Sequence, residues 1–220
     1  MTVAGWRRPQ DEQGTALLLV IALVLILAAI GAAVSVASRT ETLIAANFRQ
    51  ERETLYAAEG AVAQAVLDVS SHPDWSLVLS GVVASSFTDG AAIGARQLPG
   101  GDVVTLCCSA PSLTASLQDR GLGGRSWGAD TPQWQLFAWG RVADWLSPGR
   151  IDSALYVAVW VADDPEDGDG NPALDSNATV LLHGQALGPR GGRQVIDTLI
   201  RREAPHPAPV RIISWREGRW

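Results

Sequence analysis

The longest hydrophobic segment of the chain lies near its start, from Thr15 to Ser38, and its 24 residues include no charged side chain. A helix rises about 1.5 Å per residue, so this segment would be roughly 36 Å long. The hydrocarbon layer of a bilayer is about 30 Å thick. The segment is apolar on every side, whereas a surface helix of a soluble domain has polar residues on one side. The pattern therefore predicts a transmembrane helix.

Two other interpretations of this segment fit it less well. A helix in the core of a soluble protein would be expected to show a polar side, which this segment lacks. The hydrophobic region of a cleaved secretory signal is normally about 7–15 residues long, so this segment is too long for one.

Residues 39–70 change to the pattern of an amphipathic helix. Apolar residues recur at intervals near multiples of 3.6; these are Ile44, Phe48, Leu55, Val62, Val66 and Val69. Charged residues fill the other side and allow pairs such as Arg49 with Glu53. Pro73 disfavours helical angles in the residue before it, so the helix should end near there. We therefore expect one unbroken helix from Thr15 to about Val69.

Residues 71–220 follow a shorter period, with apolar runs separated by Gly, Pro, Ser and Asp, which is typical of strands and turns. We expect strands at Asp102–Leu106, Gln133–Trp145, Ile151–Ala162, Thr179–Leu187, Arg193–Arg202 and Val210–Glu217. The second and third of these should form one hairpin, and the fourth and fifth another. Trp75–Leu98 is ambiguous, and Ala110–Pro132 is expected to be an irregular loop.

Ala154–Ala162 is apolar on both faces, which predicts a central strand covered on one side by the amphipathic helix. The fold class that follows is α+β: a long N-terminal helix, transmembrane in its first half and amphipathic in its second, packed on an antiparallel β-sheet head. Four tryptophans on the expected strands should fill the core rather than form a sugar-binding platform; they are Trp134, Trp139, Trp145 and Trp160.

The composition narrows the classes of function. A net charge of −6 over 220 residues gives no basic surface for nucleic acid. The two cysteines, Cys107 and Cys108, are adjacent, so a disulfide scaffold is not expected to hold the fold together. The cysteines and the three histidines make no zinc spacing. No GxSxG, HExxH or phosphate-binding loop occurs, and we expect no enzymatic activity.

An acidic segment, Asp163–Asn177, is the one candidate for a cofactor, which would be calcium. The candidate ligands are Asp167, Asp169, Asn171 and Asp175. Calcium prefers six to eight oxygen ligands, and oxygen side chains at alternate positions can turn inward together. A standard EF-hand is not expected, because Pro172 and Ala178 replace its Gly and its final carboxylate. The alternative is a solvated acidic turn whose side chains bind backbone amides.

The junction before the apolar segment carries a resemblance to a known family. A short polar leader ends at Gly14 and is followed by Thr15 and the uninterrupted apolar helix. Arg7 and Arg8 in the leader favour an N-terminus in the cytoplasm. This order resembles a type IV prepilin, whose leader is cut directly after that Gly, so residues 1–14 would be removed. Leu19 departs from the family, which usually has Glu at the fifth mature position, and that departure argues against an ordinary repeating pilin subunit.

The segment after the membrane helix adds to the resemblance. It contains AANFR at Ala45–Arg49 and AAEGAV at Ala57–Val62, and it resembles PilX-type minor pilins from Gln13 to Val69. The resemblance implies a single-pass protein of the bacterial inner membrane with a periplasmic head. Its partners would be a prepilin peptidase and other pilins, bound through the N-terminal helix.

In this interpretation the chain is a minor pilin that takes part in type IV pilus assembly. Small residues in the apolar helix would allow close packing between subunits; these are Ala28, Ala29, Gly31, Ala32 and Ala33. Two alternatives remain open: a minor pseudopilin of a type II secretion system, and an unprocessed, membrane-anchored binding domain.

Overall fold

The computed structural model describes residues 11–122, 131–145, 152–203 and 208–219. The chain divides into two compact units, Met1–Arg49 and Gln50–Trp220. The longest element is helix α1, Asp11–Ser71, whose last residues belong to the second unit. The expected unbroken helix is therefore confirmed.

In the first unit, α1 exposes large apolar side chains from Leu17 to Val36. Three hydroxyl groups in and just after this segment bond within the helix itself. Ser35, Thr40 and Thr42 each donate to the carbonyl oxygen four residues earlier, at 2.9–3.1 Å. Such bonds let Ser and Thr occur in a helix that lacks other polar partners.

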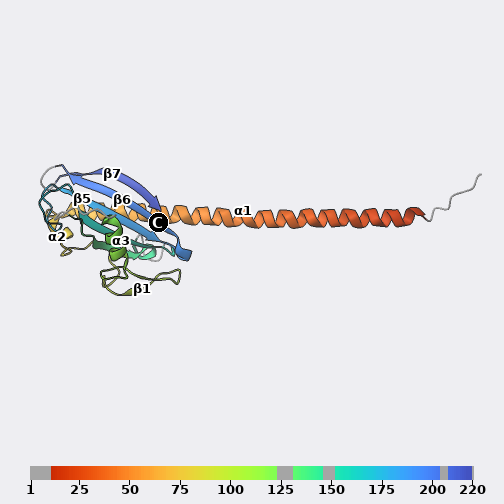
Figure 1. Ribbon diagram of the computed structural model, residues 1–220, viewed down its shortest axis with the longest axis horizontal. Helices are drawn as coiled ribbons and strands as arrows, with labels where there is room; N and C mark the ends of the chain where they lie inside the picture. Colours follow the sequence, from red (N-terminus) through yellow and green to blue (C-terminus); the bar gives the residue numbers. More distant parts are fainter. Residues whose placement is uncertain (1–10, 123–130, 146–151, 204–207, 220) are drawn as a thin grey trace, which may run out of the picture. The chain divides into compact units, whose positions relative to one another are not determined.

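The second unit contains a five-stranded sheet in the order β3-β4-β5-β6-β7, with every neighbouring pair antiparallel (Figure 1). The strands are β3 Gln135–Arg141, β4 Tyr156–Asp163, β5 Thr179–Leu187, β6 Arg193–Arg202 and β7 Val210–Arg219. The predicted α+β class is confirmed. Both predicted hairpins are present as antiparallel pairs, β3 with β4 and β5 with β6.

The C-terminal part of α1 packs on one face of this sheet. Its buried residues are mostly small, namely Ala57, Ala58, Ala61, Val62, Ala65 and Val69. A Cβ on Gly184 of β5 would lie 2.2 Å from Val62 Cγ2, so the close approach of helix and strand requires a glycine there. Ile44 and Phe48, the first two residues of the expected apolar stripe, are exposed in the first unit instead.

The opposite face of the sheet is covered by a second layer. This layer includes helix α3, Leu113–Leu122, and the two-stranded sheet of β1, Ala95–Gln97, and β2, Val103–Thr105. It buries a second core made of Leu98, Leu106, Leu117, Trp139, Tyr156, Ala158, Trp160 and Leu187. The Trp160 indole donates to Thr114 Oγ1 at 2.7 Å, which joins β4 to α3.

Helix α3 corrects the prediction that Ala110–Pro132 is an irregular loop as far as residue 122; residues 123–130 of that segment lie outside the described residues. Ser112 Oγ accepts a hydrogen bond from the Ala115 amide at 3.1 Å, as an N-cap residue does. Leu113 and Leu117 are four residues apart and pack into the second core. The many Gly and Ser residues of this segment favoured the prediction of a loop, so the short amphipathic helix was missed.

A second correction concerns the end of the expected strand Gln133–Trp145, because Val142–Trp145 forms a short helix, α4. Trp145 therefore lies outside the sheet and packs partly buried beside Gly60 of α1, where a Cβ would lie 3.2 Å from its ring. Trp134 precedes β3 and is also partly buried, whereas Trp139 and Trp160 are buried as expected. A four-residue helix, α2 Ser76–Leu79, lies in Trp75–Leu98, for which the sequence pattern was ambiguous.

Arg202, at the end of β6, holds the C-terminal end of α1. Its guanidinium donates to the carbonyl oxygens of His72 and Pro73 at 2.7 and 2.8 Å. The same group lies 4.3 Å from the centroid of the Trp75 ring. A cation is favourable at a helix C-terminus, and none occurs in the last turn of α1 itself.

Cys107 and Cys108 form a disulfide with each other just after β2. Because it joins adjacent residues, it encloses no intervening segment and cannot connect distant parts of the head. The expectation that disulfides do not provide the scaffold therefore fits the structure.

Candidate functional site

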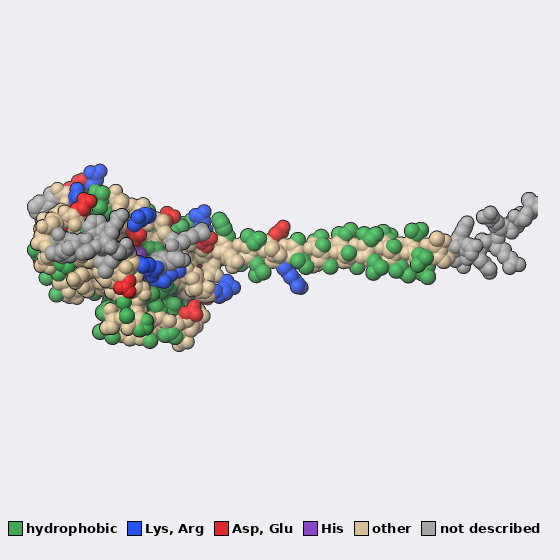
Figure 2. Space-filling model, in the orientation of Figure 1, with side chains coloured by type: hydrophobic (Ala, Val, Ile, Leu, Met, Phe, Trp, Pro, Cys, Tyr) green, Lys and Arg blue, Asp and Glu red, His purple; other side chains and the backbone are tan. Residues whose placement is uncertain are grey.

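The apolar segment of α1 is the first candidate site. Among the described residues, α1 is the one helix long and apolar enough to cross a membrane. Figure 2 shows hydrophobic side chains all along the visible face of this segment. Leu18, Leu19 and Leu25 each expose about two-thirds of their surface, with values of 67%, 70% and 64%. Exposure of so many apolar side chains marks a surface for lipid or for partner helices.

The predicted cleavage site, Gly14 and Thr15, lies in the first turns of α1. A Cβ on Gly14 would meet no atom within 4 Å, so packing among the described residues does not explain the glycine. The five small residues predicted to pack between subunits are all exposed; they are Ala28, Ala29, Gly31, Ala32 and Ala33. Cleavage after Gly14 and packing through the small residues both stay predictions.

The acidic segment follows β4 and gathers three carboxylates. Asp163, Asp167 and Asp169 each offer one oxygen, and the three oxygens lie within 4.8 Å of one another. Asp163 was absent from the predicted ligand set. The sequence signal that could have identified it is its position at the end of an apolar strand, because a side chain there lies next to the loop that follows.

Asp163 is only 2% exposed. This burial raises the pKa of its carboxyl to about 7, and the negative charges of Asp167, Asp169 and Asp175 add to the increase, against a backbone hydrogen bond from Asp164. The site therefore places carboxylates close together. A bound cation or a proton would reduce the repulsion between their negative charges.

The other two predicted calcium ligands have local roles. Asn171 Oδ1 accepts from the Ala173 amide at 3.2 Å, and Asp175 Oδ1 accepts from the Thr179 amide at 3.2 Å. Asp167 also binds the amide of Ser176, at 2.8 Å. These are the bonds expected of an acidic turn, so calcium binding stays a prediction that the geometry alone does not decide.

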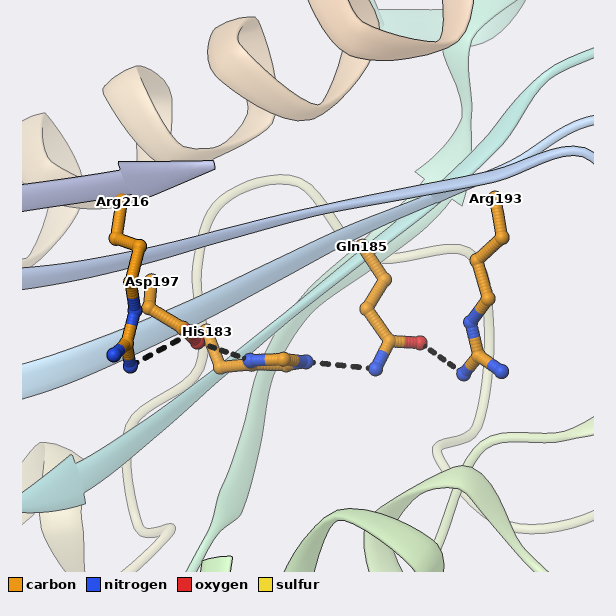
Figure 3. Close-up of polar contacts among 5 residues, drawn as sticks. All are labelled: His183, Gln185, Arg193, Asp197 and Arg216. Atoms are coloured by element: carbon orange, nitrogen blue, oxygen red, sulfur yellow. Dashed lines mark hydrogen bonds and ion pairs between the residues drawn. The ribbon is translucent and has the colours of Figure 1, made fainter. Parts of the chain in front are cut away.

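A chain of polar side chains crosses β5, β6 and β7 on the face opposite α1 (Figure 3). Arg216 Nη2 lies 3.4 Å from Asp197 Oδ2, and Asp197 Oδ1 lies 2.5 Å from His183 Nδ1. His183 Nε2 is 2.7 Å from Gln185 Nε2, and Gln185 Oε1 accepts from Arg193 at 2.5 Å. His183 and Gln185 are buried.

These partners assign the proton on the imidazole. Asp197 accepts, so His183 Nδ1 carries the hydrogen, and Nε2 accepts from the Gln185 amide. Burial acts to raise the pKa of Asp197, but its contacts with His183 and Arg216 hold the pKa below the usual value. Burial lowers the pKa of Arg193 to about 10, and Arg120 nearby adds to this decrease.

A histidine paired with an aspartate suggests general-base chemistry. Here both ring nitrogens of His183 are engaged, so neither is presented to a substrate in this arrangement. Its ring also lies 5.7 and 5.8 Å from the rings of Trp134 and Trp160. The polar chain thus ties three strands together, from the exposed Arg216 on β7 to His183 and Gln185, which are buried beside the second core. Sequence reasoning missed it, because His183 and Asp197 become neighbours only through the register of β5 and β6.

No family model matches the chain, and no curated protein or solved structure matches it either.

Proposed function

We propose that this chain is a minor pilin that takes part in assembling a type IV pilus. The observation that supports the proposal best is the form of α1: an uncharged segment, Thr15–Ser38, long enough to cross a bilayer, continued by an amphipathic part that packs on an antiparallel sheet. This is the plan that the prepilin-like junction at Gly14 leads one to expect.

In this proposal the apolar part of α1 anchors the chain in the inner membrane and later packs against the same segment of neighbouring subunits. The small residues around Gly31 allow backbones to approach, and van der Waals packing then holds the helices together. The head domain is periplasmic. The work of the protein is assembly, and it requires no reaction at the polar chain around His183.

The proposal is tested at the N-terminus. The full chain is expressed in a bacterial membrane with and without a prepilin peptidase, and its mass is measured after purification in detergent. We expect a mature chain that begins at Thr15 when the peptidase is present. An intact leader under the same conditions would overturn the proposal and favour an unprocessed anchor.

Two variants make this experiment specific. Gly14→Leu is expected to leave the leader uncut. Gly31→Leu is the matched control, because Gly31 is also a glycine of α1 with open space around its Cβ position, and cleavage should continue. Loss of surface pili on deletion of the gene, with protein secretion intact, would distinguish a pilus subunit from a secretion pseudopilin.

A further inference from the structure

Strand β7 is the exposed edge of the five-stranded sheet. It pairs with β6 on one side, and among the described residues no strand pairs with its other side. Every residue from Arg211 to Glu217 is exposed. They include Ile212, Ile213 and Trp215, which expose 52%, 50% and 39% of their surface. A strand with apolar side chains and unpaired backbone groups is a template for another strand.

The register divides the side chains of β7 between the two faces of the sheet. Ile212 is opposite Ile200 and Trp215 is opposite Thr198, so both lie on the side of α1. Arg211 is opposite Arg201 and Arg216 is opposite Asp197, on the side of the polar chain. The α1 side of β7 thus carries apolar side chains together with Glu217, and the other side is a basic face.

The basic face carries unused donors. Arg211 contacts Glu203 at 2.7 Å and Arg216 contacts Asp197 at 3.4 Å, each through one nitrogen. The side chains of Arg211 and Arg216 stay 69% and 80% exposed. A guanidinium has five N–H groups, so each can bind a further carboxylate. Arg201, directly across from Arg211, adds a third positive charge to this face.

A second copy of β7 fits this edge poorly. In an antiparallel pair centred on Ser214, Arg211 would be opposite Glu217 of the other copy. However, the pairing of β7 with β6 is interrupted by a bulge between Ile212 and Ser214. The bulge places Arg211 and Glu217 on different faces of the sheet, so the two charges would not meet.

We infer that β7 binds an extended strand of another protein by edge-to-edge pairing. On the α1 side, the incoming strand places apolar side chains beside Ile212 and Trp215. On the other side, it places carboxylates beside Arg211 and Arg216. Backbone hydrogen bonds give such pairing its affinity, and the side chains choose the partner. The inference rests on β7 alone and does not use the proposed pilin class.

The test uses the full chain in detergent micelles and a synthetic peptide that alternates Val and Asp and is as long as β7. Hydrogen exchange of the backbone amides is followed with and without the peptide. We expect exchange in β7 to slow by about tenfold or more, as formation of new backbone hydrogen bonds requires. Exchange in β3 should not change, because its outer side already bonds to residues 85–89.

Two controls define what would overturn the inference. Arg211→Gln combined with Arg216→Gln should weaken peptide binding by about tenfold, whereas Arg141→Gln on β3 should not. A Val–Arg peptide that protects β7 equally well would refute the role of charge. Absence of any protection would refute strand pairing. Protection that arises without peptide and grows with protein concentration would show that a second copy occupies the edge, contrary to the inference.

Discussion

Strands β4 and β7 both contain large apolar residues, yet they meet opposite environments. All eight residues of β4 are buried, whereas β7 is exposed from Arg211 to Glu217. Strand β4 pairs with a strand on each side. Helix α1 covers one of its faces, and the second layer covers the other. Among the residues that the structure describes, strand β7 pairs with one strand, β6. The comparison teaches that an apolar sequence predicts a strand, while its position in the sheet determines whether the strand stabilises the head or remains open to a partner.

The most direct way to break this comparison is to remove one tryptophan from each strand. Trp160→Ala in β4 deletes a side chain with no exposed surface and its bond to Thr114. The free energy of unfolding should fall by about 3–5 kcal/mol. Trp215→Ala in β7 should lower it by less than about 1 kcal/mol, because that side chain is partly solvated. Urea unfolding of the full chain in micelles measures both; equal losses would contradict the comparison.

Glycine substitutions sharpen the same contrast. Gly184→Ala places a Cβ against Val62 and should cost about 1–3 kcal/mol through overpacking. Gly218→Ala in β7 is the matched control, because its nearest neighbour, Val195 Cβ, would be 4.0 Å away. Combining Gly184→Ala with Val62→Ala should recover part of the loss, and a strictly additive double variant would argue against a direct clash.

The end of β4 supplies a prediction about pH. The pKa of Asp163 is raised to about 7 from its ordinary 3.8, so the folded protein holds its proton more tightly than the unfolded chain does. Stability should therefore fall as pH rises from about 4 to 7. Asp163→Asn should remove this dependence and raise stability at pH 8 by on the order of 1 kcal/mol, with no gain at pH 3. Thermal melts across this range decide; a gain at pH 3 as well would exclude titration as the cause.

The smallest expected effect concerns calcium in the loop after β4. If Asp163, Asp167 and Asp169 hold the ion, calcium should raise the melting temperature at pH 8 relative to chelator, by a few degrees for a weak site. Replacing both Asp167 and Asp169 with Ala should abolish the difference. Magnesium serves as the control ion. No calcium-dependent shift in the parent chain would leave the loop as an acidic turn.

Much of this fold could be predicted from the sequence, because its main elements carry local signals. The uncharged run after Gly14 and the Gly-rich turn before Arg193 define α1 and the hairpin of β5 and β6. The second layer was harder to predict. Leu113 and Leu117 are the leucines of α3 that the structure shows in the second core, and β1 gains its partner β2 from across a turn.

The candidate site was predictable only in part. Asp167 and Asp169 stand out as alternating carboxylates, but Asp163 joins them because of how the loop folds back on the strand end. The pairing of His183 with Asp197 depends on the register between two strands, which no local pattern specifies. Contacts of this kind follow from tertiary structure, so they are out of reach of periodicity and spacing.

The contact between Arg202 and the carbonyl of His72 joins residues 130 positions apart in the chain. A nascent or truncated polypeptide that stops before β6 would carry the complete helix α1 without this contact just beyond its C-terminal end. The contact therefore forms only when almost the whole polypeptide has been made. We expect that fragments lacking the last two strands are degraded by proteases rather than accumulating as a stable, shortened head.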